Sequence, residues 1–107
     1  MKALLIPALL LACLPACAAT QPCHDVARAQ ARNLLAFHTD GDDRAQLGDS
    51  VKTLPPLSNP ANKGQKLLVL ELTGQVYKAE YRIRMTYFPL DRQCVLMGQE
   101  IIELSSL

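Results

Sequence analysis

The sequence lacks a dominant charge and is poor in aromatic residues. Its 107 residues carry 11 Lys and Arg against 10 Asp and Glu, with no Trp. A nucleic-acid-binding domain needs a basic surface, and electrostatic membrane binding needs a polybasic patch. The charge balance therefore argues against both, and we expect no nucleic-acid partner.

A run of apolar residues long enough to cross a bilayer is also missing. The uncharged stretch from Ala3 to Leu14 is the longest of its kind, whereas a membrane span needs about 20 apolar residues. Lys2 before this stretch and Ala16-Cys17-Ala18 after it are typical of a cleaved secretion signal. We predict a signal peptide over residues 1–19 and a single domain over residues 20–107, located in the periplasm or the medium. Loss of Lys2 then balances the two signs of charge.

A second interpretation of the same segment is a lipid anchor. Leu14-Pro15-Ala16-Cys17 resembles a bacterial lipobox, as does the earlier segment that ends at Cys13. Under this alternative Cys17 becomes the lipidated first residue, and the protein is anchored in the bacterial envelope.

The mature chain has no C-x-x-C pair, the usual spacing of a catalytic dithiol. Cys23 and Cys94 are the two cysteines that follow residue 19. In an exported domain, two cysteines predict one disulfide. We therefore predict a structural Cys23–Cys94 bond.

Periodicity predicts an α+β fold with one N-terminal helix packed across a four-stranded antiparallel meander. Apolar residues at helical spacing indicate a helix over 22–38. Strands are expected over 47–54, 66–73, 76–88 and 93–104, with Gly74-Gln75 as the two-residue turn of a hairpin. Residues 55–65 contain three prolines and a glycine and are expected to be irregular.

The predicted turns set a register, and strict alternation then divides the strands into two faces. With Leu72 opposite Tyr77 and Met85 opposite Leu96, the face toward the helix comprises Leu68, Leu70, Leu72, Tyr77, Ala79, Tyr81, Ile83, Met85, Tyr87, Cys94, Leu96, Ile102 and Leu104. Glu100 also falls on this face, so either the final strand has a β-bulge near Gly98, which we favour, or Glu100 hydrogen-bonds a tyrosine hydroxyl at the rim of the core. The outer face is unusually apolar for solvent, and we expect it to be an interaction surface formed by Leu67, Val69, Arg82, Arg84, Val95, Met97 and Ile101.

Residue patterns for catalysis or metal binding are lacking. His24 and His38 lie at opposite ends of the predicted helix, roughly 20 Å apart. The acidic segment from Asp40 to Asp49 does not follow the oxygen ladder of a calcium loop. We expect no catalytic residue, no metal and no cofactor, and hence a protein that is not an enzyme.

A helix followed by an antiparallel sheet resembles the cystatin-like arrangement, and a PepSY-like domain is an alternative with a related order of elements. Cystatin inhibitors insert a Q-x-V-x-G hairpin into a protease cleft. The corresponding residues here are Gln75-Val76-Tyr77-Lys78-Ala79, in which Tyr77 replaces Val and Ala79 replaces Gly; the family's second-hairpin Trp is absent. The chain also resembles many short secreted bacterial proteins.

Two functions follow as hypotheses. The first is a non-enzymatic module that binds another envelope protein, or a second copy of itself, through the outer sheet face. The second is a secreted inhibitor of a hydrolase that acts through its hairpin tips, at Gly74-Gln75 and at residues 89–92.

Overall fold

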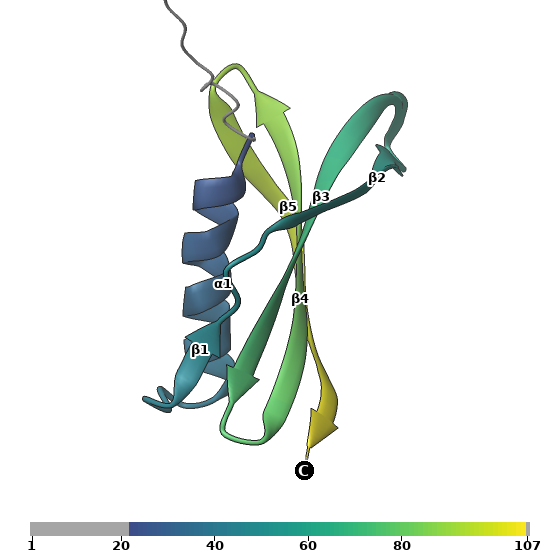
Figure 1. Ribbon diagram of the computed structural model, residues 1–107. Coiled ribbons are helices and arrows are strands. Elements are labelled where there is room, and N and C mark those ends of the chain that lie inside the picture. Colours follow the sequence, from purple (N-terminus) through teal and green to yellow (C-terminus); the bar gives the residue numbers. More distant parts are fainter. Residues whose placement is uncertain (1–21, 107) are drawn as a thin grey trace, which may run out of the picture.

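The computed structural model describes residues 22–106, and the predicted signal peptide and lipobox lie outside this part of the chain. One helix precedes five strands: α1 (His24–His38), β1 (Ala45–Leu47), β2 (Lys52–Asn59), β3 (Asn62–Val76), β4 (Ala79–Leu90) and β5 (Gln93–Ser106). The helix lies against one face of a curled antiparallel sheet (Figure 1). This confirms the α+β class. Within residues 22–106, no helix has both the length and the apolar character needed to cross a membrane.

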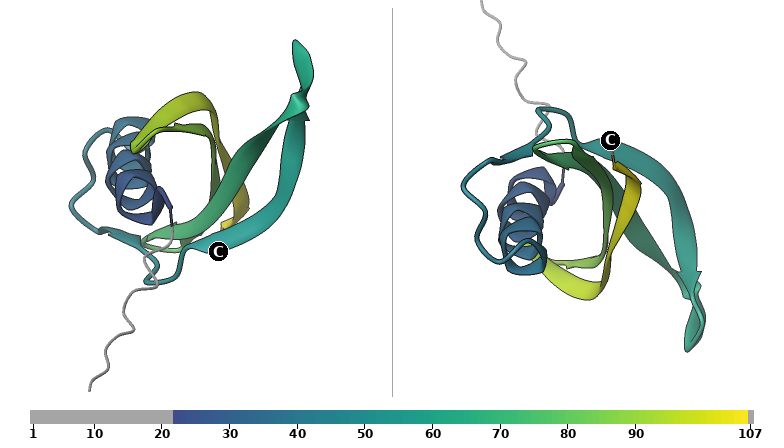
Figure 2. Two further views of the ribbon diagram at one scale, coloured as in Figure 1. Left: turned by 90° about the horizontal axis from the view of Figure 1, so that it is seen from above. Right: turned by 90° about the horizontal axis from the view of Figure 1, so that it is seen from below.

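The sheet is organised around β3, its longest strand. β4 pairs along one edge of β3 and β5 pairs with β4, while β1 and β2 share the other edge of β3. Seen along the helix, β3, β4 and β5 curl around α1, whereas β2 and the first half of β3 swing away from it (Figure 2).

The helix packs on the sheet through a stripe of small side chains. Ala27, Ala31 and Leu35 recur every four residues and are buried, as expected for one face of a helix. Gly74 on β3 lies directly beneath Leu35, where a Cβ atom would come within 2.9 Å of Leu35 Cδ2. Gly74 therefore lies within a strand at a position where the helix approaches the sheet too closely for a larger side chain.

The predicted turn at Gly74-Gln75 is wrong. The chain reverses at Tyr77-Lys78, with Val76 opposite Ala79 and Tyr77 in the left-handed region at φ 55°. Leu72 thus pairs with Ile83 instead of Tyr77. Because the register moved by an even number of residues, most side chains kept their predicted face. Tyr77 and Val76 are exceptions: Tyr77 leaves the core for the hairpin tip, and Val76, which was not on the predicted core face, is buried in the core.

The β4–β5 hairpin is longer than predicted, with its turn at Asp91-Arg92 and Leu90 opposite Gln93. The predicted bulge near Gly98 is confirmed, because Tyr87 pairs with Leu96 but Thr86 pairs with Gly98, which leaves Met97 as the extra residue.

The bulge exchanges the faces of the residues that follow, because the shift of the hairpin register before it is even. Ile101 pairs with Ile83 and packs against the core, whereas Glu100 pairs with Arg84 on the outer face. The core positions predicted for Ile102 and Leu104 are wrong, since these side chains are exposed. Leu96 is also exposed, although it faces the same way as Tyr87.

Residues 55–65 form regular structure, contrary to the prediction. Most of this segment belongs to the β2–β3 hairpin. The register of β2 slips between the Leu54–Val69 and Leu57–Leu67 pairs, so Pro55 and Pro56 occupy a bulge. Strands accommodate proline at bulges and edges because its missing N–H is not needed there.

Cys23 and Cys94 lie at disulfide distance, as predicted. Their sulfur atoms are 2.12 Å apart and their Cα atoms 5.8 Å apart. The pair connects the residue before α1 to the second residue of β5. It therefore links the start of the helix to the sheet next to the β4–β5 turn.

Candidate functional site: a groove on the outer sheet face

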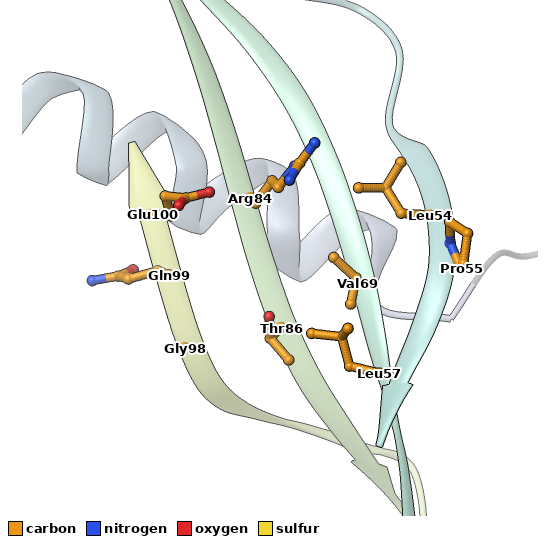
Figure 3. Close-up of a pocket in the computed structure, with 9 residues that line it drawn as sticks. All are labelled: Leu54, Pro55, Leu57, Val69, Arg84, Thr86, Gly98, Gln99 and Glu100. Carbon is orange, nitrogen blue, oxygen red and sulfur yellow. The ribbon is translucent and has the colours of Figure 1, made fainter. Parts of the chain in front are cut away.

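An open groove of about 600 Å³ lies on the sheet face opposite the helix. Four strands contribute to it (Figure 3). Its lining consists of Leu54, Pro55 and Leu57 from β2, Val69 from β3, Arg84 and Thr86 from β4, and Gly98, Gln99 and Glu100 from β5.

The wall on the β2 side of the groove is apolar. Leu54 pairs with Val69 and Leu57 with Leu67 across the β2–β3 ladder, which places each pair on the same face of the sheet. Val69 and Leu67 are each only 6% exposed as a result, while Leu57 remains 53% exposed toward the groove. The expectation that Leu67 and Val69 lie open to solvent is therefore wrong, because β2 covers them.

The charged residues of the groove are matched to one another. Glu71, Arg84 and Glu100 are direct neighbours across β3, β4 and β5. Arg84 Nε donates to Glu71 Oε1 at 2.8 Å, and Arg82 lies 3.7 Å from Glu100 Oε1. Alternating charges on adjacent strands stabilise the sheet modestly. They also leave little net charge in the groove.

Gly98 opens the groove on the β5 side. A Cβ atom at this position would meet nothing closer than Thr86 Cβ, at 3.9 Å. The side chain of the next residue, Gln99, points away from the groove (Figure 3) and accepts a hydrogen bond from Gln30 Nε2 on the helix. The β5 wall therefore consists largely of backbone beside Gly98.

The structure divides the predicted interaction surface into three parts. Val69 and Arg84 line the groove, and Arg82, two residues before Arg84 on β4, lies 3.7 Å from Glu100 of that groove. Val95 and Met97 are exposed on β5 at 37% and 48%. Leu67 is covered by β2, and Ile101 packs against the core, so neither is available to a partner as predicted.

Sequence reasoning missed the groove because it predicted one strand over 47–54 that ends before Pro55, whereas the structure has β1 over Ala45–Leu47 and β2 over Lys52–Asn59, so the sheet has five strands instead of the predicted four. The available signal was a pair of leucines, Leu54 and Leu57, on either side of Pro55-Pro56. Two prolines ordinarily end a strand, and only the bulge permits both leucines to face the same way.

The titratable residues outside the groove are separate from one another. His24 Nε2 is 3.3 Å from Thr53 Oγ1, while His38 stacks edge-on against Tyr81 with ring centroids 5.4 Å apart. Asp42 accepts three hydrogen bonds from Arg44, which lower the pKa of its carboxyl to about 2. Within residues 22–106, no group of three or more His, Cys, Asp or Glu side chains is placed to hold a metal ion.

One predicted hairpin tip, Gly74-Gln75, differs from the structure, whereas the other, residues 89–92, contains the observed turn at Asp91-Arg92. Gly74 and Gln75 lie within β3, and Gln75 pairs with Glu80. The tip itself presents Tyr77, 61% exposed, with Arg44 Cζ 4.8 Å and Lys78 Nζ 5.4 Å from the centre of its ring. The turn at Tyr77-Lys78 lies within the segment from Gln75 to Ala79 that the cystatin resemblance places at a hairpin tip, while Gln75 itself belongs to the β3–β4 ladder.

The chain matches no family model, no curated protein and no solved structure.

Proposed function

We propose that this protein is an exported, non-enzymatic module of the cell envelope that binds an apolar segment of another protein in the outer-face groove. The observation that carries the proposal is the groove itself. Its β2 wall presents the half-exposed Leu57, and the charges of its floor are paired. Sites that bind through apolar contact combine concavity with a few fixed polar groups.

Export is supported by the cysteine pair and by the leader pattern. A cysteine pair at disulfide distance suits an oxidising compartment. We keep periplasmic or secreted protein as the proposed location, with a lipid anchor at Cys17 as the alternative. A cystatin-like or PepSY-like relationship also remains a proposal, supported by the order of helix and strands.

Site-specific photocrosslinking tests the groove. A photoreactive amino acid at position 57 should capture a discrete protein in envelope extract, whereas the same group at position 90 should not. Leu90 is a suitable control because it is 47% exposed, close to Leu57 at 53%, but lies at the β4–β5 hairpin and not in the groove.

A charge introduced into the wall should abolish capture. With the crosslinker at Thr86, Leu57→Lys should remove the product because a solvated ammonium cannot be buried against an apolar segment at low cost. Leu90→Lys should leave the product unchanged. Equal capture from both variants would place binding elsewhere and overturn the proposal.

A second candidate is an inhibitor that acts through the β3–β4 tip. The exposed Tyr77, flanked by Arg44 and Lys78, favours this hypothesis. A Tyr77→Ala variant that loses partner capture while Leu57→Lys retains it would support the tip over the groove.

A further inference from the structure

The two edges of the sheet are protected very unequally. The edge that β1 and β2 form has a three-residue strand, a bulge at Pro55-Pro56 and Lys52. β5 has 14 residues and contains no Pro, Lys or Arg, and between its irregularities at Met97 and Leu104 the residues from Gly98 to Glu103 pair regularly with β4. A regular edge segment without Pro, Lys or Arg invites pairing by another strand. Within residues 22–106, β5 pairs only with β4, so its outer edge is free.

Exposed apolar side chains are concentrated on this strand. Five of the ten large apolar residues that are exposed in the described part of the chain lie on β5: Val95, Leu96, Met97, Ile102 and Leu104. They occupy both faces, since Leu96 pairs with the buried Tyr87 and Ile102 pairs with Arg82. A second strand alongside β5 would cover apolar surface on both faces.

The charges of β5 exclude two registers for pairing with its own copy. A two-fold axis perpendicular to the sheet places one residue opposite itself, because paired residues must share a face. An axis at Glu100 or at Glu103 sets identical carboxylates against each other, which is unfavourable. An axis at Ile101, near the middle of the regular segment between Gly98 and Glu103, avoids this. Glu100 then faces Ile102 of the second copy, and Glu103 faces Gln99.

Two side chains are already arranged for this register. Gln30 donates to Gln99 Oε1 at 2.9 Å, so the NH₂ group of Gln99 remains a donor for the Glu103 carboxylate of the second copy. Leu104 falls opposite Gly98 of the second copy, where the space next to Thr86 is open. Leu104 of one copy would thus extend the apolar rim of the other copy's groove.

We propose that two copies pair antiparallel through β5, with the two-fold axis at Ile101, to form one continuous sheet. The proposal goes beyond the groove function and does not depend on it. Leu57 lies on β2 at the other edge, so a groove variant can lose its partner while the dimer persists, and the reverse also holds.

Two substitutions of Ile102 test the pairing by analytical ultracentrifugation of residues 20–107. Ile102→Glu sets a carboxylate opposite Glu100 of the second copy, at two places per dimer, and should weaken the dimer by about tenfold or more. Ile102→Lys sets an ammonium there and should retain it. Within its own chain Ile102 neighbours Arg82, so the glutamate variant should remain folded by circular dichroism.

The register has its own test. Glu100→Cys and Ile102→Cys proteins, mixed and oxidised, should give a disulfide between the two variants in preference to either homodimer. A monomeric wild-type protein at high micromolar concentration would overturn the proposal. Equal weakening by both charges at position 102, or crosslinking in homodimers alone, would also do so.

Discussion

At the scale of single residues, two glycines of the sheet have opposite requirements. Gly74 lies beneath Leu35, which is buried, and the space for a Cβ atom is occupied. Gly98 lies beside an open groove with no atom closer than 3.9 Å to a built Cβ. The two positions therefore form a matched pair in which one tolerates a side chain and the other does not.

Gly74→Ala should lower the free energy of unfolding by about 1–3 kcal/mol, the usual cost of overpacking a core. Gly98→Ala should be neutral or slightly stabilising, because alanine loses less backbone entropy than glycine on folding. Urea denaturation measures both. A Leu35→Ala, Gly74→Ala double variant should cost less than the sum of the single changes, since it removes the clash. Additive costs would contradict the proposed contact.

At the scale of elements, the helix depends on its attachment to β5. The Cys23–Cys94 pair spans 71 residues of sequence, and closing a loop of this length in the unfolded chain contributes on the order of 4 kcal/mol. The helix otherwise contacts the sheet through a narrow buried stripe of Ala27, Ala31 and Leu35 and through exposed polar pairs such as Gln30–Gln99 and His24–Thr53. We therefore expect the Cys23–Cys94 linkage to contribute a large share of the free energy that holds α1 on the sheet.

Replacing both cysteines with alanine should reduce stability by roughly 2–5 kcal/mol. Thermal unfolding followed at a helix-sensitive wavelength measures the loss, and reduced wild-type protein is the control with unchanged packing. Mass spectrometry of non-reduced tryptic peptides should show the two cysteine peptides linked. Free thiols at both positions in protein from an oxidising compartment would contradict the bond.

At the scale of the whole molecule, the groove and the free edge of β5 are two surfaces on one sheet. β2 forms one wall of the groove, while the β5 edge lies two strands beyond β3. The two surfaces adjoin at β5, because Gly98, Gln99 and Glu100 line the groove and also belong to the strand that would pair with a second copy. Leu57 on β2 and Ile102 on β5 are separated by β3 and β4, so we expect changes at these two positions to act independently.

A Leu57→Lys, Ile102→Glu double variant should lose partner capture to the same extent as Leu57→Lys alone. Its dimer should be weakened to the same extent as that of Ile102→Glu alone. Crosslinking from Thr86 measures the first, and sedimentation measures the second. If Ile102→Glu alone abolished capture at the groove, binding would require the dimer, and the two surfaces would be one site.

Much of this fold could be read from sequence because it follows local rules. Helical spacing located α1 within two residues at its start, and period-two alternation assigned Leu70, Leu72, Ile83 and Met85 to the core. The core assignment remained correct although the turn was misplaced, because the register error was an even number of residues. The cysteine pair could be predicted from the number of cysteines that follow residue 19 and from the expected export to an oxidising compartment.

Tertiary structure decided the features on which the proposed functions rest. Gly74 suits a turn in isolation, and only the approach of Leu35 shows that it serves helix packing. In the sequence, Pro55-Pro56 predicts the end of a strand. Pairing with β3 places these prolines in a bulge, so the side chains of Leu54 and Leu57 both face the groove. Likewise the extra residue at Met97 determines that Ile101 faces the core and Ile102 the solvent. The physical reason is common to all three: alternation and propensity specify which residues can share a face, but contacts between residues distant in sequence determine where strands pair and slip.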